Sequence, residues 1–248
     1  FFVIILPFIT VAITSFTVNM GKPLTLSNLS LKAWEKVFSR ASIISSTTNS
    51  FLAATAAAFF GILISCVMAY LLQRTNVKGK RIPDFLITLG SGTPSVTIAL
   101  ALIISMSGKF GINIYNTLTI MVVAYMIKYM LMGMRTVVSA MSQVHPSLEE
   151  AAQISGANWL RMLKDVTLPL IAASIVAGIF LIFMPSFYEL TMSTLLYSSN
   201  TKTIGYELYI YQTYHSQQVA SALATAILLF VILVNYILNK LTKGQFSI

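Results

Sequence analysis

Long apolar stretches without Asp, Glu, Lys or Arg recur along the chain and are separated by short polar segments. They cover residues 1–21, 41–73, 85–108, 110–127, 166–188 and 208–239. Each contains an apolar core of about 17–25 residues, the length at which a helix crosses the hydrocarbon of a bilayer. Lipid offers no partners to backbone polar groups, and the stretches lack the alternation of barrel strands. The pattern predicts an all-α integral membrane protein with six transmembrane helices.

The composition agrees with a lipid environment and argues against a nucleic-acid partner, a disulfide framework and a metal site. Only 9% of the 248 residues are charged and 56% are apolar, whereas soluble proteins carry about 25% charged residues. The net charge of +9 comes from scattered basic residues, which excludes a nucleic-acid partner. The single cysteine, Cys66, excludes a disulfide framework. His145 and His215 are too far apart in the sequence to indicate a metal site.

Sidedness follows from the basic residues. Four of them fall within the short segment after the second apolar stretch, namely Arg74, Lys78, Lys80 and Arg81. Because basic loops stay in the cytoplasm, this segment is expected there. An even number of spans then places both termini and residues 135–167 on the cytoplasmic side.

The predicted organisation has three parts. Residues 1–45 form a first transmembrane helix and an external segment, 46–241 a core of five helices with a cytoplasmic loop at 143–167, and 242–248 a cytoplasmic tail. The chain begins with Phe1 inside an apolar stretch, which suggests a trimmed chain or a piece of a longer polypeptide.

The second stretch carries a small residue at every fourth position. The stripe consists of Ala53, Ala57, Gly61, Ser65 and Ala69. Small side chains let a neighbouring helix approach closely, and close packing is what joins helices in lipid. The stripe therefore predicts a bundle of mutually packed helices.

Residues 145–169 predict two short cytoplasmic helices. Ser147 followed three positions later by Glu150 has the spacing of a capping box. Gly156 suits the position just after a helix, where φ is positive. A second helix over 157–164 carries Trp159. Two interpretations stay open from the physics alone: the pair docks in a groove of a partner, or it folds against its own bundle.

The same segment resembles the EAA loop of binding-protein-dependent ABC importer permeases, whose bundle is MetI-like. The family pattern is Glu-Ala-Ala, three residues, Gly, nine residues, Ile, any residue and Leu-Pro. Here Glu150 opens the pattern, Gly156 follows at the right spacing, Val166 replaces Ile, and Leu168 and Pro169 close it.

The resemblance implies that this loop is the coupling helix that sits in a cleft of a separate ATPase subunit. The implied ATPase-coupling residues are Glu149, Glu150, Ala151, Ala152, Gly156, Ala157 and Trp159, with Leu168 and Pro169 as the hinge into the membrane. The implied partners are an ABC ATPase dimer, a second permease half (homologous, fused or identical), an extracytoplasmic solute-binding protein and membrane lipid. The implied location is the bacterial inner membrane.

Further segments are similar to the ferric-iron branch of this family. They are residues 49–51, 92–94, 187–190 and 194–197. Ferric iron is therefore the expected cargo. Relatives that handle phosphonates, polyamines or sugar phosphates have similar segments and remain alternatives.

A few side chains are weak candidates for a translocation path. Glu189 would face a polar cavity or reach water at the interface, because a carboxylate in lipid is costly. Lys128 would line an inner cavity or snorkel to the cytoplasmic surface. Tyr188 and Pro94 complete the set.

Energy for transport is expected from another chain. A phosphate-binding loop needs Gly five positions before its Gly-Lys pair and Ser or Thr after it. The pairs at 21–22, 79–80 and 108–109 fail at both positions. The chain is thus not expected to be an enzyme or to bind a cofactor, and ATP and Mg would be bound by the partner. A secondary transporter driven by an ion gradient is a less favoured alternative, because it would require more paired charges within the membrane. An intramembrane enzyme is also disfavoured, because it would require a set of catalytic residues that the sequence does not indicate.

Overall fold

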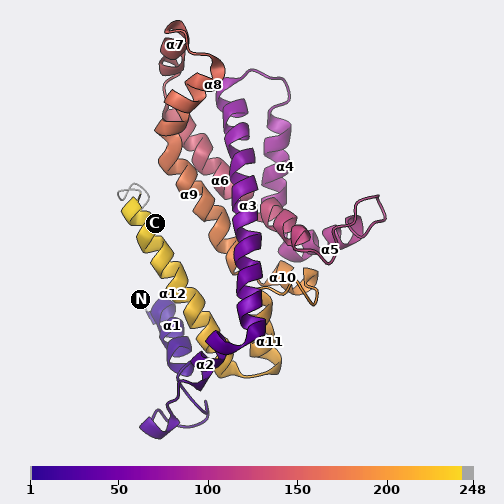
Figure 1. Cartoon of the computed structure of the whole chain (residues 1–248), viewed down its shortest axis with the longest axis vertical. Helices are drawn as coiled ribbons and strands as arrows, with labels where there is room; N and C mark the ends of the chain where they lie inside the picture. Colours follow the sequence, from indigo (N-terminus) through magenta and orange to yellow (C-terminus); the bar gives the residue numbers. More distant parts are fainter. Residues whose placement is uncertain (1, 242–248) are drawn as a thin grey trace.

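The protein is described by a computed structural model that covers residues 2–241 (Figure 1). In chain order the elements are α1 (Phe2–Thr14), the 3₁₀ helix η1 (Leu26–Asn28), α2 (Lys32–Ser39), α3 (Ala41–Arg74), α4 (Arg81–Gly92), α5 (Ser95–Ser105), α6 (Leu118–Gln143), α7 (Pro146–Ile154), α8 (Trp159–Met162), the π-helical turn η2 (Leu163–Thr167), α9 (Leu168–Phe187), α10 (Thr191–Leu196), α11 (Ile204–Tyr214) and α12 (Gln217–Leu241). Over the described residues the fold is all-helical, with two isolated β-bridges and no strand.

Three long helices, α3, α6 and α9, pack together as the centre of the molecule (Figure 1). The small residues predicted to form a stripe on α3 are all buried. The backbones approach most closely at Gly133 of α6 and Gly178 of α9. A Cβ placed on Gly178 would lie 2.7 Å from Ile62 Cδ1 and 3.4 Å from Gly133 Cα. Within the stripe, a Cβ on Gly61 would lie 3.1 Å from Ile182 Cδ1, so the small residues let side chains of α9 pack directly against α3.

Four helices over residues 2–241 are long and apolar enough to cross a membrane. They are Ala41–Arg74, Leu118–Gln143, Trp159–Phe187 and Gln217–Lys240. The pair α4–α5 meets the same test together but is bent by 112°. The stretch 85–108 is therefore not one continuous helix, and its crossing of the membrane as one span stays a prediction. Pro94 lacks an N–H and pushes Thr93 into extended backbone (φ −72°, ψ 138°), so the helix breaks there.

The fourth span begins later in the sequence than expected. Residues 110–117 precede α6, which starts at Leu118 and continues through Arg135 to Gln143. Arg135 is accommodated because its guanidinium lies 3.0 Å from the Asp84 carboxylate of α4. The non-helical connection to the next element therefore starts at residue 144 rather than 135.

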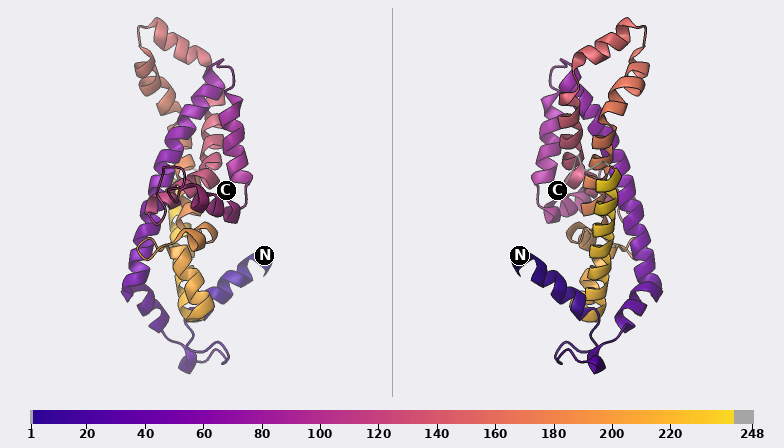
Figure 2. Two further views of the ribbon diagram at one scale, coloured as in Figure 1. Left: turned by 90° about the vertical axis from the view of Figure 1, so that its right-hand side faces the viewer. Right: turned by 90° about the vertical axis from the view of Figure 1, so that its left-hand side faces the viewer.

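The first apolar stretch forms a shorter helix than expected. α1 has 13 residues, about 20 Å of helix. Its C-terminal end packs against α12, and its N-terminal end points away from α12 (Figure 2). The total of six crossings stays a prediction for this reason. The tail predicted at 242–248 lies outside the described residues.

Candidate functional site

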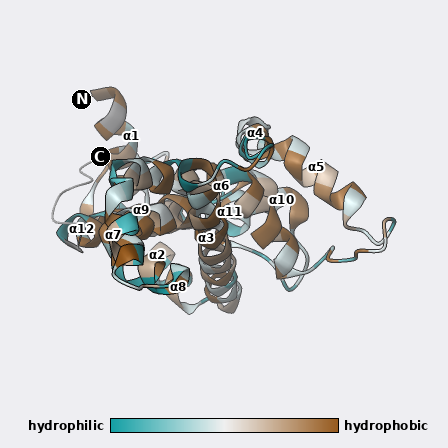
Figure 3. Cartoon of the chain, turned by 90° about the horizontal axis from the view of Figure 1, so that it is seen from above, coloured by the Kyte–Doolittle hydropathy of each residue, from teal (hydrophilic) through white to brown (hydrophobic). Residues whose placement is uncertain are grey.

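A bent pair of helices projects from one end of the bundle, beyond the ends of α3 and α4 (Figures 1 and 2). This elbow (residues 145–167) consists of α7, α8 and η2. Viewed from this end, it exposes polar as well as apolar residues (Figure 3). Its second arm is not a separate helix, because α8 runs through η2 directly into α9. Pro169 has no N–H to offer to the preceding turn, and the π-helical register there, with Leu168 N–H bonded to Leu163 O, absorbs the mismatch.

Local sequence fixes both ends of α7. The capping-box prediction is wrong, because the N-cap is His145, whose Nδ1 accepts the Ser147 N–H at 3.3 Å, and Pro146 already occupies the first helical position. The prediction for Gly156 is confirmed, since its φ is +87°. The N–H groups of Gly156 and Ala157 bond to carbonyls of Gln153 (2.9 Å) and Ala152 (3.0 Å). This pair of bonds is a Schellman motif, which turns the chain sharply between the two arms.

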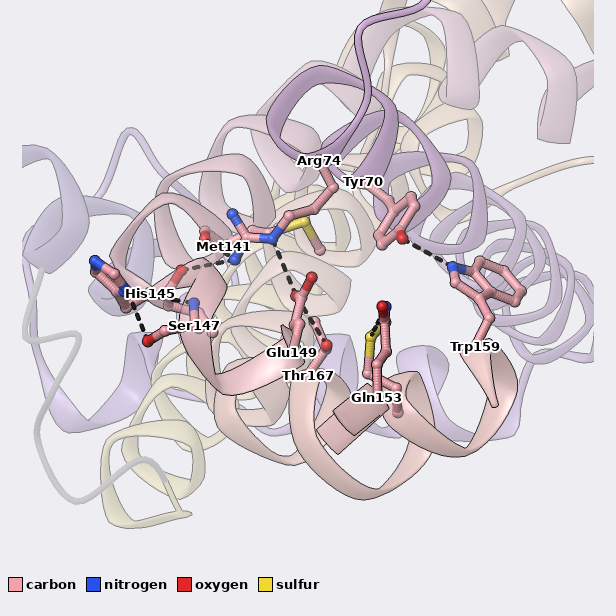
Figure 4. Close-up of polar contacts among 11 residues, drawn as sticks. Tyr70, Arg74, Met141, His145, Ser147, Glu149, Gln153, Trp159 and Thr167 are labelled. Atoms are coloured by element: carbon pink, nitrogen blue, oxygen red, sulfur yellow. Dashed lines mark hydrogen bonds and ion pairs between the residues drawn. The ribbon is translucent and has the colours of Figure 1, made fainter. Parts of the chain in front are cut away.

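The first arm is fixed to the bundle by a buried ion pair. Glu149 is 6% exposed, and its Oε1 lies 3.0 Å from Arg74 Nε at the end of α3 (Figure 4). The same oxygen accepts a 3.0 Å hydrogen bond from the Thr167 hydroxyl. Arg74 Nη2 donates to the carbonyls of Val144 (2.6 Å) and Met141 (3.2 Å). One guanidinium thus joins the ends of α3 and α6 to α7, and through Glu149 to η2.

The second arm is fixed to the same helix one turn earlier. Trp159 Nε1 donates to the Tyr70 hydroxyl at 2.8 Å, and the two rings meet edge to face at 5.7 Å (Figure 4). Gln153 Nε2 reaches Met162 Sδ at 3.3 Å and links the two arms to each other. Sequence reasoning missed Tyr70 and Arg74. The only signal for Arg74 was its place as the first charge after a long apolar run.

The outward face of the elbow carries most of the remaining coupling residues. Glu150 and Ala151 are exposed, while Ala152 and Ala157 are half-buried. The elbow also exposes apolar side chains, with Ile154 and Leu160 at 88% and 68% exposure, and an ion pair between Arg161 and Asp165. Leu168 and Pro169 lie exposed where the second arm becomes α9. The elbow therefore has an anchored inner side, where Glu149 lies, and an exposed side of mixed apolar and charged character, which includes Glu150.

The structure places the candidate path residues at two sites, with Glu189 next to Tyr188 at the end of α9 and Lys128 at the bend that contains Pro94. Glu189 is 9% exposed and binds within the protein, accepting from the Tyr129 hydroxyl (2.8 Å) and from Met192 N–H (2.8 Å). It thereby fixes α10 to the end of α9. Lys128 donates to the carbonyls of Ser91 (3.0 Å) and Thr93 (2.8 Å) at the bend between α4 and α5. Its ammonium satisfies carbonyls that the break leaves without helical partners.

A hollow of about 1360 Å³ opens between α6, α9 and α12 and runs from the base of the elbow to Tyr188. Its polar lining residues include Thr136, Ser139, Gln143, Ser174, Asn235 and Asn239. Among the described residues that line it there is no Asp, Glu, Lys or Arg, and Lys128, Glu189 and Pro94 are not part of it. Of the predicted path residues, Tyr188 alone borders this space.

Replacing Lys128 by methionine is expected to loosen the bend between α4 and α5. Two carbonyls would lose their donor in an apolar environment, at a cost of about 1–3 kcal/mol. The measurement is the alkylation rate of a cysteine placed at Ser91, in a Cys66→Ser background, which should rise. Lys109→Met, in an exposed loop, is the control and should leave the rate unchanged; an equal rise in both would refute the role of Lys128.

The fold and the elbow together define a transporter subunit of a known class. The family model for the inner membrane component of binding-protein-dependent transport systems matches residues 61–244, and the chain belongs to this family. The protein is thus a membrane-embedded, multi-pass permease of the ABC importer type with a MetI-like bundle.

Individual relatives differ in their cargo. The chain is 27% identical over 203 residues to a putative ferric transport system permease protein, FbpB 1 of Haemophilus influenzae, covering 79% of this chain but 30% of that one. It is 27% identical over 255 residues to the trehalose/maltose permease protein MalG of Thermococcus litoralis, covering 96% and 90%. The sulfate permease protein CysT of Salmonella typhimurium is 25% identical over 228 residues, covering 87% and 82%.

Among solved structures, a bacterial ABC transporter involved in the import of the acidic polysaccharide alginate contains a chain that superposes with a TM-score of 0.78. The alignment covers 99% of this chain and 92% of that one at 16% identity. A chain of the MetNI methionine ABC transporter superposes with a TM-score of 0.65 at 14% identity, covering 82% and 96%. These similarities establish the fold.

Proposed function

We propose that this chain forms one half of the translocation pathway of an ATP-driven importer, and that its elbow docks in a cleft of a separate ATPase subunit. The observation that carries the proposal is the two-sided elbow. Its inner side is fixed to α3 by the Arg74–Glu149 pair, while Glu150, Ile154 and Leu160 are exposed. A short helix with exposed apolar side chains suits docking into a groove of a partner.

The remaining partners follow from the same proposal. The hollow between α6, α9 and α12 is open on one side and lined by neutral polar and apolar residues, which suits a face completed by a second permease half. An ABC ATPase dimer would bind ATP and Mg, because none of the Gly-Lys pairs in this chain has the flanking residues of a phosphate-binding loop. The elbow and both termini would lie in the cytoplasm, and a solute-binding protein would deliver cargo on the opposite side.

Ferric iron is the cargo that we propose. Supporting it are the residues similar to the ferric-iron branch at 187–190 and 194–197 and the relatives described as ferric permease proteins. The test is uptake of radioactive ferric iron by cells with and without the chain. Import of sulfate or of a disaccharide, without import of ferric iron, would refute this cargo and favour that of the sulfate or trehalose/maltose relatives.

Gly156→Asp is expected to abolish ATPase association and transport. The substitution puts a side chain at φ +87° and would shift the second arm relative to the first, so that the exposed side no longer fits one groove. Retention of the ATPase in co-purification, measured by its ATP hydrolysis, should fall about tenfold or more.

Gly111→Asp is the matched control for this substitution. Gly111 has φ +83°, and a Cβ there, as at Gly156, meets nothing within 4 Å. Gly111 lies in the loop between α5 and α6, away from the elbow. Both variants should insert normally. If both, or neither, lose the ATPase, docking through the elbow is refuted.

A further inference from the structure

Both arms of the elbow are attached to the same helix. Tyr70 and Arg74 stand one turn apart at the end of α3, and they hold Trp159 of α8 and Glu149 of α7 respectively. The ion pair between Arg74 and Glu149 is buried, since each side chain is only 8% exposed. A displacement of the elbow therefore either moves this end of α3 or breaks buried polar contacts, which is costly.

The other end of α3 is attached just as firmly to a second segment. This distal segment (residues 198–207) comprises the connection from α10 to α11 and the first turn of α11, and it lies beside the half of α3 that is farther from the elbow (Figure 1). Asn49 Nδ2 donates to the backbone carbonyls of Asn200 (3.0 Å) and Lys202 (2.9 Å). The Ser50 hydroxyl accepts the N–H of Ile204 at 2.8 Å. These contacts fix the distal backbone directly to α3.

Between the two attachments α3 is uninterrupted. It runs for 34 residues without proline, and Asn49 and Arg74 are 25 positions apart, about 37 Å along a helix. By contrast, α9 reaches the elbow through the π-helical turn η2, and α4 and α5 are bent by 112°. α6 also runs to the base of the elbow without a proline. α3 differs from it because both arms of the elbow bond to α3 through side chains, Trp159 to Tyr70 and Glu149 to Arg74.

We propose that α3 carries movement of the elbow across the membrane to the distal segment, with Arg74 and Asn49 as the positioning residues at its two ends. The proposal rests on the proposed function, since it needs an ATPase that moves the elbow. The distal segment is in turn tied to the α5–α6 connection, because the Ser198 hydroxyl donates to Asn116 O at 3.3 Å. Movement of α3 would therefore change the surface formed by the distal segment and the α5–α6 connection, away from the elbow, as alternating access requires.

The test follows the distal segment in the complete transporter, with its ATPase, in lipid vesicles. Ser199 is exposed, and Ser199→Cys in a Cys66→Ser background gives one reactive thiol. Its alkylation rate by a membrane-impermeant maleimide is measured with and without ATP plus vanadate. We expect nucleotide to change the rate in the otherwise unaltered chain. Arg74→Met and Asn49→Ala should each reduce that change about fivefold or more, compared at equal amounts of bound ATPase.

Matched controls exclude a general loss of structure. Thr48→Ala removes an exposed hydroxyl next to Asn49 that bonds only to Ile44 O within α3. Arg81→Met removes an exposed charge from the basic segment that follows α3. Both controls should keep the full nucleotide response. Asn49→Gln keeps an amide at this position and should therefore keep part of the response that Asn49→Ala loses.

Outcomes separate the inference from the proposed function. Failure of any ATPase to bind the unaltered chain would refute the proposed function. Two outcomes with bound ATPase would refute transmission through α3 and leave the proposed function standing. In the first, the alkylation rate of Ser199→Cys does not change with nucleotide; in the second, it changes as much in Arg74→Met and Asn49→Ala as in the otherwise unaltered chain. Because these variants leave α6 and α9 unchanged, an equal response would assign the transmission to those two helices.

Discussion

Glu149→Leu is expected to detach the first arm of the elbow from the bundle. The change leaves Arg74 buried without its anionic partner and Thr167 without its acceptor. Removing one partner of a buried ion pair costs about 3–5 kcal/mol. Because the contacts lie at the tip of the molecule, the loss should appear as local opening of residues 144–167 rather than as unfolding of the spans.

The measurement is limited proteolysis of the purified chain, which should cut within the elbow at least about tenfold faster in Glu149→Leu. Glu150→Leu is the matched control, since Glu150 neighbours Glu149 but is exposed. The double variant Arg74→Met with Glu149→Leu should recover part of the protection, because it leaves no unpaired buried charge. Equal cleavage of Glu149→Leu and Glu150→Leu would show that the ion pair does not hold the elbow.

Gly178→Leu is expected to separate the central helices. A Cβ at this position already meets Ile62 Cδ1 at 2.7 Å, and the Cα and carbonyl oxygen of Gly133 both lie at 3.4 Å. Ile62 has a flexible end that can move, but the backbone of α6 cannot yield without moving the helix. Overpacking of this kind costs about 1–3 kcal/mol for a few added methylenes, and a whole leucine side chain between two backbones should exceed the upper value.

Unfolding of the detergent-purified chain by increasing SDS, followed by circular dichroism, measures this loss. Gly92→Leu serves as control, because a Cβ there meets nothing within 4 Å. Gly178→Ala should be milder, and Ile62→Val should offset it, since it removes the one atom closer than 3 Å. An unchanged midpoint for Gly178→Leu would mean that α6 and α9 do not cross at these glycines.

Several features of the elbow were readable from the sequence because they depend on nearest neighbours. Gly156 was expected at a positive φ, which only glycine adopts freely, and it has φ +87°. The start of α7 was misplaced by two residues because His145 and Ser147 compete for the same cap, and Pro146 decides between them. The continuity of α8 with α9 was missed because a proline signals a boundary, yet a single π-helical turn accommodates it.

Charged side chains within or beside the bundle were the hardest to place. Glu149 and Glu150 are adjacent and chemically identical, yet one is buried against Arg74 and the other is exposed. Lys128 and Glu189 were considered as path or interface groups, whereas the first binds carbonyls at a helix break and the second binds Tyr129 and Met192. Met192 is three residues from Glu189, but Arg74, Tyr129 and the carbonyls that Lys128 binds are distant in sequence from their partners, so no local pattern reveals them.

The sequence by itself determined that the chain is a helical membrane protein, which segments are apolar, and where a glycine-linked pair of helices interrupts them. These properties depend on hydropathy and backbone sterics, which act over a few residues. Only the tertiary structure decided that Tyr70 and Arg74 hold the elbow and that Asn49 and Ser50 hold the distal segment. Such contacts join residues that are remote in the chain, and their geometry exists only once α3, α6 and α9 have packed together.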